Sequence, residues 1–253
     1  MNKLFVLVFA VGLALPADLP KRYQCRRAPS IVTVDGRLDE AAWRRAPWTD
    51  FFVDIEGDAK PSPRFRTRAK MLWDDTYFYV AADMEEPHVW ATLTQHDSVI
   101  FHDNDFEVFI DPNGDTNEYY EFEINALNTG WDLFLAKPYR FGGKARNEWE
   151  IPGLRTAVHV RGTLNDASDR DAGWSVEITF PWKVLGEYAH KAAPPRLNDE
   201  WRVNFSRVEW VHEVVGGAYR RKAGLKEDNW VWSPQGLVNM HIPEKWGVVV
   251  FRR

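Results

Sequence analysis

The sequence predicts an all-β fold with a single domain, built as a β-sandwich or a β-barrel. Short stretches of alternating apolar and polar residues recur along the chain, and turn residues separate them at spacings of about 8–12 residues. No amphipathic helix of ordinary length is present. The 253 residues contain no internal repeat and no clear linker, which favours one domain over two.

The individual elements follow from local signals. Asp35-Gly36 is a turn after the first predicted strand, and Asp39 is expected to cap a short helical turn over 40–45. A second helical turn is predicted over 181–186, and residues 216–229 predict a long loop. Strands are predicted at 30–34, 64–73, 77–84, 106–110, 119–125, 130–136, 156–162, 174–180, 201–211, 229–232 and 247–251.

The N-terminus has the features of a secretory signal peptide. A basic start is followed by an uncharged apolar run over 4–15, and Ala17 offers a small residue for cleavage. We therefore predict a signal peptide over 1–17, an N-terminal approach segment over 18–29 and a binding domain over 30–253. This predicts a secreted or periplasmic protein with no membrane span after cleavage; a retained membrane anchor is the alternative.

The composition narrows the class of ligand. A formal net charge of −5 argues against nucleic acid and against an anionic membrane surface. The single cysteine, Cys25, excludes an intramolecular disulfide. Thirteen tryptophans are the outlier. Most are expected in the core, but aromatic rings also stack on the C–H faces of sugar rings, so a carbohydrate is the favoured ligand.

The strand around residue 107 carries polar groups on one face. Side chains alternate along a strand, so Phe106, Val108 and Ile110 share one face. The opposite face carries Asp105, Glu107, Phe109 and Asp111. Carboxylates beside an aromatic ring are suited to a hydroxyl-rich ligand. The following strand repeats the pattern, with Glu121, Glu123 and Asn125 on one face.

Several motifs, in order, resemble the family 9 carbohydrate-binding modules. They begin with V-D-G-R-L-D-E-A-A-W over 34–43 and continue with T-R-A-K-M-L-W-D-D-T-Y-F-Y over 67–79. The central strand is D-F-E-V-F-I-D over 105–111, followed by W-S-V-E-I-T-F-P-W over 174–182. The chain closes with W-S-P at 232–234 and H-I-P-E-K-W-G over 241–247.

This resemblance implies an immunoglobulin-like antiparallel β-sandwich that binds carbohydrate, in characterised members at the reducing ends of plant polysaccharides. In such modules two tryptophans hold the sugar, helped by a Glu, an Arg and an Asn. On this chain the first tryptophan falls at Phe101, the Glu at Glu107 and the Asn at Asn125. The Arg falls at Glu123 and the second tryptophan at Met240, so the two-tryptophan clamp is not reproduced.

The residues predicted to bind the ligand are Phe101, Glu107, Glu123, Asn125, Arg207, Trp232 and His241. The missing second wall is expected from one of four side chains, namely Trp232, Trp210, Trp90 or His241. Each prediction has a structural alternative. The acids alternate as on the solvated face of a sheet, Phe101 suits a core position, and Asn125, Arg207 and His241 suit purely structural hydrogen bonds.

A structural calcium ion is the one cofactor that the sequence suggests. Asp111, Asn113 and Asp115 place oxygen donors at alternate positions, as calcium loops do, and the resemblance also implies calcium. The spacing of the glycine does not match an EF-hand, and a plain turn is the alternative.

Two other functions are kept as alternatives. A glycoside hydrolase acting on xylan-type or glucan-type polysaccharide needs a defined pair of carboxylates, and no pair is singled out here. A haem-binding electron carrier would take ligands such as Met71, Met84 or Met240 with a histidine, but no C-x-x-C-H motif is present. The sequence therefore favours an exported, non-catalytic protein whose partner is an oligosaccharide or polysaccharide.

Overall fold

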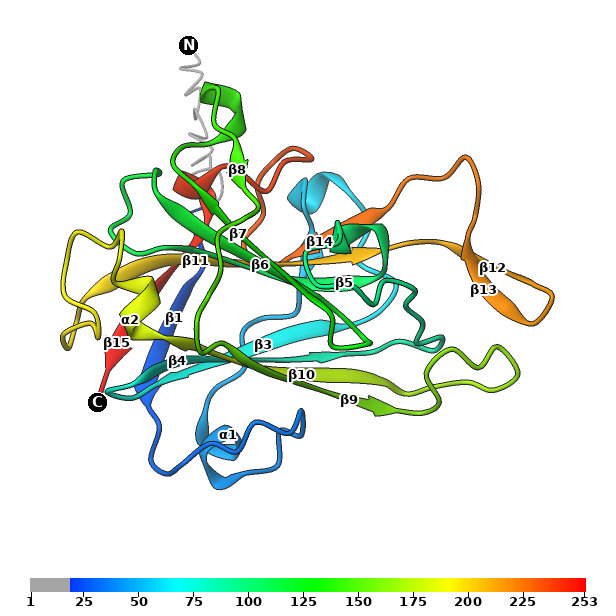
Figure 1. Ribbon diagram of the computed structural model, residues 1–253, viewed down its shortest axis with the longest axis horizontal. Coiled ribbons are helices and arrows are strands. Elements are labelled where there is room, and N and C mark those ends of the chain that lie inside the picture. Colours follow the sequence, from blue (N-terminus) through cyan, green and yellow to red (C-terminus); the bar gives the residue numbers. More distant parts are fainter. Residues whose placement is uncertain (1–18) are drawn as a thin grey trace, which may run out of the picture.

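The computed structural model describes residues 19–253, which form two β layers packed face to face (Figure 1). The predicted all-β sandwich is confirmed. The predicted signal peptide lies outside the described residues. Within the described part of the chain, no helix is long and apolar enough to cross a membrane.

The elements agree with most of the predicted ones. The strands are β1 (Arg22–Arg27), β2 (Val53–Asp54), β3 (Thr67–Trp73), β4 (Tyr77–Met84), β5 (Asp105–Asp111), β6 (Tyr119–Asn125), β7 (Gly130–Leu135), β8 (Ala145–Arg146), β9 (Arg155–Arg161), β10 (Gly173–Pro181), β11 (Glu200–Glu209), β12 (His212–Val215), β13 (Ala218–Arg221), β14 (Asp228–Val231) and β15 (Gly247–Arg252). The helices are α1 (Ala41–Arg45) and α2 (Trp182–Leu185), with 3₁₀ turns η1 (Gly57–Ala59), η2 (Ile100–His102), η3 (Tyr139–Phe141) and η4 (Pro243–Lys245).

One continuous hydrogen-bonded sheet forms both layers. Its order is β8-β7-β6-β5-β11-β15-β1-β3-β4-β10-β9, and β14 pairs with β11 and β2. Strands β5, β6, β7 and β11 lie in one layer, and β3, β4, β9 and β10 lie in the other (Figure 1). Strand β1 joins the layers by pairing in parallel with β15 and β3. The predicted approach segment 18–29 therefore contains a central strand, and the sheet is not wholly antiparallel.

The core lies between the two layers, as the alternation in β5 predicts. Phe106, Val108 and Ile110 are at most 1% exposed and belong to the main core cluster. Phe106 stacks on Phe205 of β11 with ring centroids 5.6 Å apart. Most large tryptophans are buried, as expected: Trp174, Trp182, Trp201 and Trp232 belong to this core, and Trp43 and Trp246 are fully buried in two smaller clusters.

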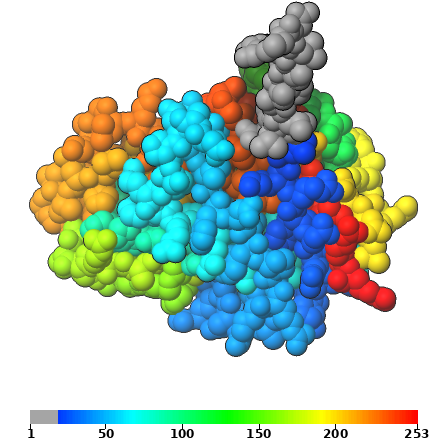
Figure 2. Space-filling model, turned by 180° about the vertical axis from the view of Figure 1, so that it is seen from behind, coloured from blue at the N-terminus to red at the C-terminus, as the bar shows by residue number. Residues whose placement is uncertain are grey.

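The first family motif, residues 34–43, is hydrogen-bonded to β10 and forms no strand of its own. The backbone N–H groups of Asp35 and Gly36 donate to the Glu177 carboxylate of β10, at 2.8 and 2.7 Å, and so does the indole of Trp43. Gly36 has φ +81°, and a Cβ there would lie 2.6 Å from the β9 backbone. The predicted strand 30–34 is wrong, because these hydrogen bonds hold the segment where it pairs with no strand of the sheet. Figure 2 shows α1 and its neighbouring loops covering much of the back of the molecule.

The basic segment predicted as a long loop is partly a hairpin. Strands β12 and β13 pair with each other, and they form a sheet separate from the main ladder. The hairpin projects from one end of the sandwich (Figure 1).

Candidate functional site

A cavity of about 450 Å³ lies on the outer face of strands β5, β6 and β7. The strands supply its floor, and loops from distant parts of the chain supply its walls. Its lining residues are Ile55, Phe101, Glu107, Phe109, Glu121, Glu123, Trp131, Leu133, Tyr139, Val208, Glu227, Asn229, Val238, Asn239, Met240 and His241. Phe101, Glu107, Glu123 and His241 were predicted from sequence, and the fold brings these four together.

Three glutamates form the floor of the cavity. Glu107 of β5 lies directly opposite Glu123 of β6, and Phe109 lies opposite Glu121. These glutamates are at most 5% exposed, so the alternative of a solvated acidic face is wrong. Glu123 accepts the backbone N–H of Phe101 at 2.9 Å, whereas Glu121 Oε2 is buried without a hydrogen-bond partner.

Burial keeps protons on these acids. It raises the pKa of Glu107 to about 7. A hydrogen bond with Ser206 lowers this pKa by a smaller amount, and the negative charge of Glu227 raises it further. Burial and the negative charge of Glu107 also raise the pKa values of Glu121 and Glu123 well above their usual range. Asp105, which lies beside Glu107 on the same face, is affected in the same way. Like charges this close share protons, so the floor is only partly ionised at neutral pH. A protonated carboxyl both donates and accepts hydrogen bonds.

Aromatic rings form the walls. Phe101 packs against Trp131 with ring centroids 6.3 Å apart and an interplanar angle of 30°. Tyr139 packs edge-on against His241 at 4.4 Å. Burial lowers the pKa of His241 to about 4, so this ring is neutral at pH 7, and its Nδ1 lies 2.9 Å from the Tyr119 hydroxyl. The cavity thus combines apolar ring faces with hydrogen-bonding groups.

Asn125 and Trp232 lie away from the cavity lining. Asn125 is fully buried and donates to the Leu93 carbonyl at 2.8 Å and to Asp103 at 3.0 Å, which fixes the loop before β5. Trp232 is 1% exposed and packs between Phe205 and Gly247. A Cβ on Gly247 would lie 2.3 Å from the Trp232 ring, so a glycine is needed there.

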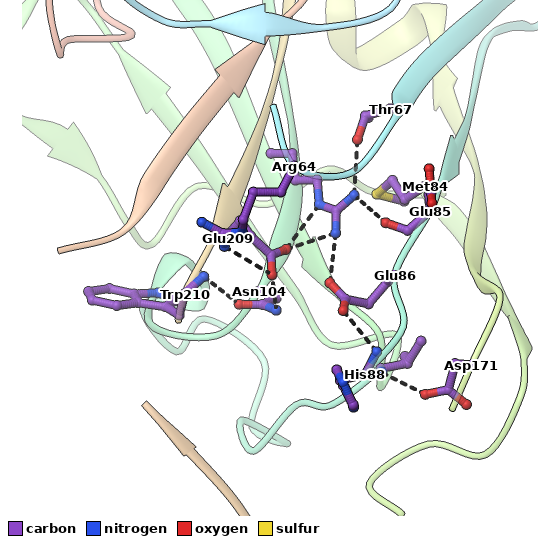
Figure 3. Close-up of polar contacts among 12 residues, drawn as sticks. Arg64, Thr67, Met84, Glu85, Glu86, His88, Asn104, Asp171, Glu209 and Trp210 are labelled. Atoms are coloured by element: carbon purple, nitrogen blue, oxygen red, sulfur yellow. Dashed lines mark hydrogen bonds and ion pairs between the residues drawn. The ribbon is translucent and has the colours of Figure 1, made fainter. Parts of the chain in front are cut away.

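Arg207 also lies outside the cavity lining, in a buried network of polar groups. It donates to Glu86 at 2.7 Å and to Glu209 at 2.8 Å, and both acids are at most 2% exposed. Thr67 and the Glu85 carbonyl accept its remaining N–H groups. Figure 3 shows these partners converging from separate segments, with Asn104 bonded to Glu209. The contacts are those of a structural ion network.

Two other candidates for the second wall, Trp90 and Trp210, make structural contacts outside the cavity lining. Trp90 is 2% exposed and stacks near Tyr219, at 6.3 Å between centroids. The Trp210 indole donates to the Phe101 carbonyl at 2.9 Å, which supports Phe101 from outside the cavity.

The predicted calcium loop is closed by its own hydrogen bonds. The Asp111 carboxylate accepts the N–H groups of Gly114 and Thr116, at 2.8 and 2.9 Å. Asp115 accepts from Asn113 and from the Asn117 backbone. These contacts are those of a polar turn that is held together without a cation. Calcium at this loop stays a prediction.

A second cavity, of about 480 Å³, lies on the other layer of the sandwich. Its lining includes Arg66, Arg68, Arg161, Asp83 and Glu85. The arginines pair with these two acids at 2.9–3.4 Å. Phe51 is the one aromatic residue in the lining, so this cavity offers less for stacking than the first.

Sequence reasoning missed three aromatic side chains of the first cavity, Phe109, Trp131 and Tyr139. Phe109 was placed on the correct face of its strand, as the aromatic ring beside the carboxylates, but was left out of the residues predicted to bind the ligand. Trp131 shares one face of β7 with Leu133 and Leu135. This pattern identifies the apolar face of the strand but not the loops that cover it. Tyr139 lies in a turn that no periodic pattern marks.

Comparisons with known proteins agree with this architecture. The family described as "Carbohydrate family 9 binding domain-like" matches residues 34–196. The chain is 28% identical over 152 residues to exoglucanase XynX of Acetivibrio thermocellus, covering 60% of this chain and 12% of that protein. It is 31% identical over 117 residues to endo-1,4-beta-xylanase C of Paenibacillus barcinonensis, covering 46% of this chain and 10% of that protein.

Solved structures share the fold. A family 9 module from Caldicellulosiruptor kristjanssonii in complex with cellotriose matches with a TM-score of 0.59 and 14% identity, over 92% of this chain and 94% of that one. A protein of Bacteroides uniformis matches with a TM-score of 0.63 and 16% identity, over 92% of this chain and 99% of that one. The chain spans about a tenth of the length of the curated enzymes named above.

Proposed function

Because this chain belongs to the carbohydrate family 9 binding domain-like family, we propose that it is an exported, non-catalytic protein that binds an oligosaccharide or polysaccharide in the β5–β6–β7 cavity. The observation that carries this proposal is the meeting of buried glutamates and aromatic rings in one cavity of about 450 Å³. Solved family members in complex with cellotriose and with glucose support this ligand class.

The chemistry of binding follows from the lining. Phe101 and Trp131 offer ring faces to sugar C–H groups. Glu107, Glu121 and Glu123 offer acceptors and, when protonated, donors to sugar hydroxyls. A hydrogen bond to a charged group contributes about 1.5–3 kcal/mol, part of which offsets desolvation of the hydroxyls. Moderate affinity is therefore expected.

The alternative of a glycoside hydrolase is disfavoured by the electrostatics. Hydrolysis needs one carboxylate that stays ionised and one acid that holds a proton, in different environments. Here the pKa values of Asp105, Glu107, Glu121 and Glu123 are all raised, mainly by burial. The similarity to the exoglucanase and the xylanase covers only 12% and 10% of those enzymes. Incubation with xylan or glucan should release no reducing sugar, and steady release would favour the hydrolase alternative.

The haem alternative is disfavoured by the lining of the same cavity. Met240 and His241 both line it, but four glutamates share the surface with them. Met71 and Met84 are buried in the main core. A Soret absorbance band in the purified protein would revive this alternative.

Phe101→Ala is expected to weaken glycan binding about tenfold or more without unfolding the domain, because it removes a half-buried ring from the cavity wall. Phe51→Ala is the matched control, since Phe51 is 47% exposed and lines the other cavity. Affinity for a glycan identified on an array would be measured by calorimetry. Equal losses in both variants, or no loss in Phe101→Ala, would contradict the proposed site.

A further inference from the structure

A cluster of one histidine and three acids lies at β7, on the face of the strand opposite to the cavity-lining Trp131 and Leu133. His96 Nε2 lies 3.3 Å from Asp97 Oδ1, 3.4 Å from Asp132 Oδ1 and 3.2 Å from Glu150 Oε2. Asp132 belongs to β7, His96 and Asp97 to the loop before η2, and Glu150 to the segment after β8. Three segments distant in sequence therefore converge on one imidazole nitrogen.

The hydrogen bond at the other ring nitrogen fixes what Nε2 can do. His96 Nδ1 lies 2.9 Å from the Gly130 carbonyl oxygen, which can only accept, so Nδ1 carries a hydrogen. In the neutral ring Nε2 then presents a lone pair to three carboxylates. In the protonated ring it presents a single N–H, and the geometry of a hydrogen bond is met with Glu150.

In both protonation states of His96, two carboxylate oxygens have no hydrogen-bond donor. Asp97 Oδ1 and Asp132 Oδ1 are buried and have no hydrogen-bond partner. The Asp132 side chain is 2% exposed, and its other oxygen accepts the Ile151 N–H at 2.5 Å. Among the ion pairs of residues 19–253, Asp97, Asp132 and Glu150 pair only with His96. A buried carboxylate oxygen without a partner is costly, so a cation at this point would satisfy groups that the protein leaves unsatisfied.

The geometry suits a small divalent ion. Zinc binds imidazole nitrogen and carboxylate oxygen at about 2.0–2.2 Å in tetrahedral sites, which separates neighbouring ligand atoms by about 3.3–3.5 Å. The distances from Nε2 to Asp97 and Asp132 are of that length, and all three ligand atoms lie within 4.8 Å of one another. The bond from Nδ1 to a backbone carbonyl is the usual support of a metal-binding histidine.

From these contacts we infer that His96, Asp97 and Asp132 bind a divalent transition metal ion of the zinc type, with Glu150 or water as a further ligand. The histidine distinguishes this site from a calcium loop, because calcium takes oxygen ligands and zinc readily takes imidazole. The ion would tie the loop of His96 and the segment of Glu150 to β7, next to Trp131 of the cavity wall. Carbohydrate binding does not require it, so the inference stands apart from the proposed function.

The test is calorimetric titration of untagged full-length mature protein, stripped with a chelator and dialysed, with ZnCl₂ and with CaCl₂. We expect one zinc ion per chain, bound at least tenfold more tightly than calcium, and a melting temperature several degrees higher with zinc. His96→Ala and Asp132→Asn should each weaken zinc binding at least tenfold, while circular dichroism confirms that they fold.

His190→Ala is the matched control. His190 pairs with a glutamate, Glu118, and makes no other ion pair within residues 19–253. Its loss should leave zinc affinity unchanged. Absence of stoichiometric zinc binding, unchanged zinc affinity in folded His96→Ala, an equal loss in His190→Ala, or calcium binding as tight as zinc would overturn the inference.

Discussion

Replacing Arg207 with alanine is expected to lower the free energy of unfolding by about 3–5 kcal/mol. Its side chain is 1% exposed and donates to Glu86, Glu209, Thr67 and the Glu85 carbonyl. Burial, reinforced by the neighbouring Glu209, raises the pKa of Glu86 to about 9, so Glu86 holds a proton at pH 7. Removing the guanidinium leaves the buried carboxyl groups of Glu86 and Glu209 without their donor.

The effect should be measured by urea unfolding, with a fall in melting temperature of roughly 10 °C as a second readout. Arg66→Ala is the control, because Arg66 is 71% exposed and its ion pair with Glu85 lies at the surface. Surface pairs contribute little, so this variant should unfold almost like the wild type. A similar small change in Arg207→Ala would show that the buried network does not stabilise the fold.

Replacing Glu107 with glutamine is expected to stabilise the folded protein at alkaline pH. Because the pKa of Glu107 is raised from 4.5 to about 7, mainly by burial, the folded state binds its proton more tightly than the unfolded state does. That contribution to stability is complete below about pH 4.5 and is lost as pH rises through 7. The shift corresponds to about 3 kcal/mol, since each pKa unit is worth about 1.4 kcal/mol.

The expected result is a wild-type unfolding free energy that falls between pH 5 and pH 8, and a smaller fall in Glu107→Gln. At pH 8 the variant should be more stable by up to about 3 kcal/mol, although it binds glycan less well. Glu213→Gln is the control, because Glu213 is exposed in the β12–β13 hairpin and its loss should leave the pH profile unchanged. Parallel pH profiles for wild type and Glu107→Gln would refute the assignment of a shared proton to this floor.

Local patterns were sufficient to predict several strands. Strands β4 and β6 have the predicted bounds, because β6 alternates apolar and polar side chains and β4 is an apolar run that follows the turn at Asp74-Asp75. Strand β1 was missed because its arginines conceal the inward-facing pair Tyr23 and Cys25. The β-branched residues of 30–34 predicted a strand that the structure does not contain. Hydrogen bonds from the following Asp35 and Gly36 to Glu177 override the local preference for a strand.

The candidate site was predictable in its floor but not in its walls. Glu107 and Glu123 follow from strand register, which the sequence pattern determines. Trp131 and Tyr139 depend on how distant loops close over the sheet, and that information is not local. The same limit explains why Trp232 was assigned to the site: its side chain faces the core, and a single position in a motif does not give its direction.

The most direct test of carbohydrate binding in this cavity is an NMR titration that follows the indole N–H signals. Trp131 Nε1 has no hydrogen-bond partner and its ring lines the cavity, whereas Trp232 lies in the core. Addition of a cello- or xylo-oligosaccharide should shift the Trp131 signal, assigned with Trp131→Phe, and leave the Trp232 signal in place. Trp48 lies against Arg68 and Lys70 of β3, on the other layer. Binding without a shift at Trp131, or with shifts confined to Trp48, would contradict the proposed site.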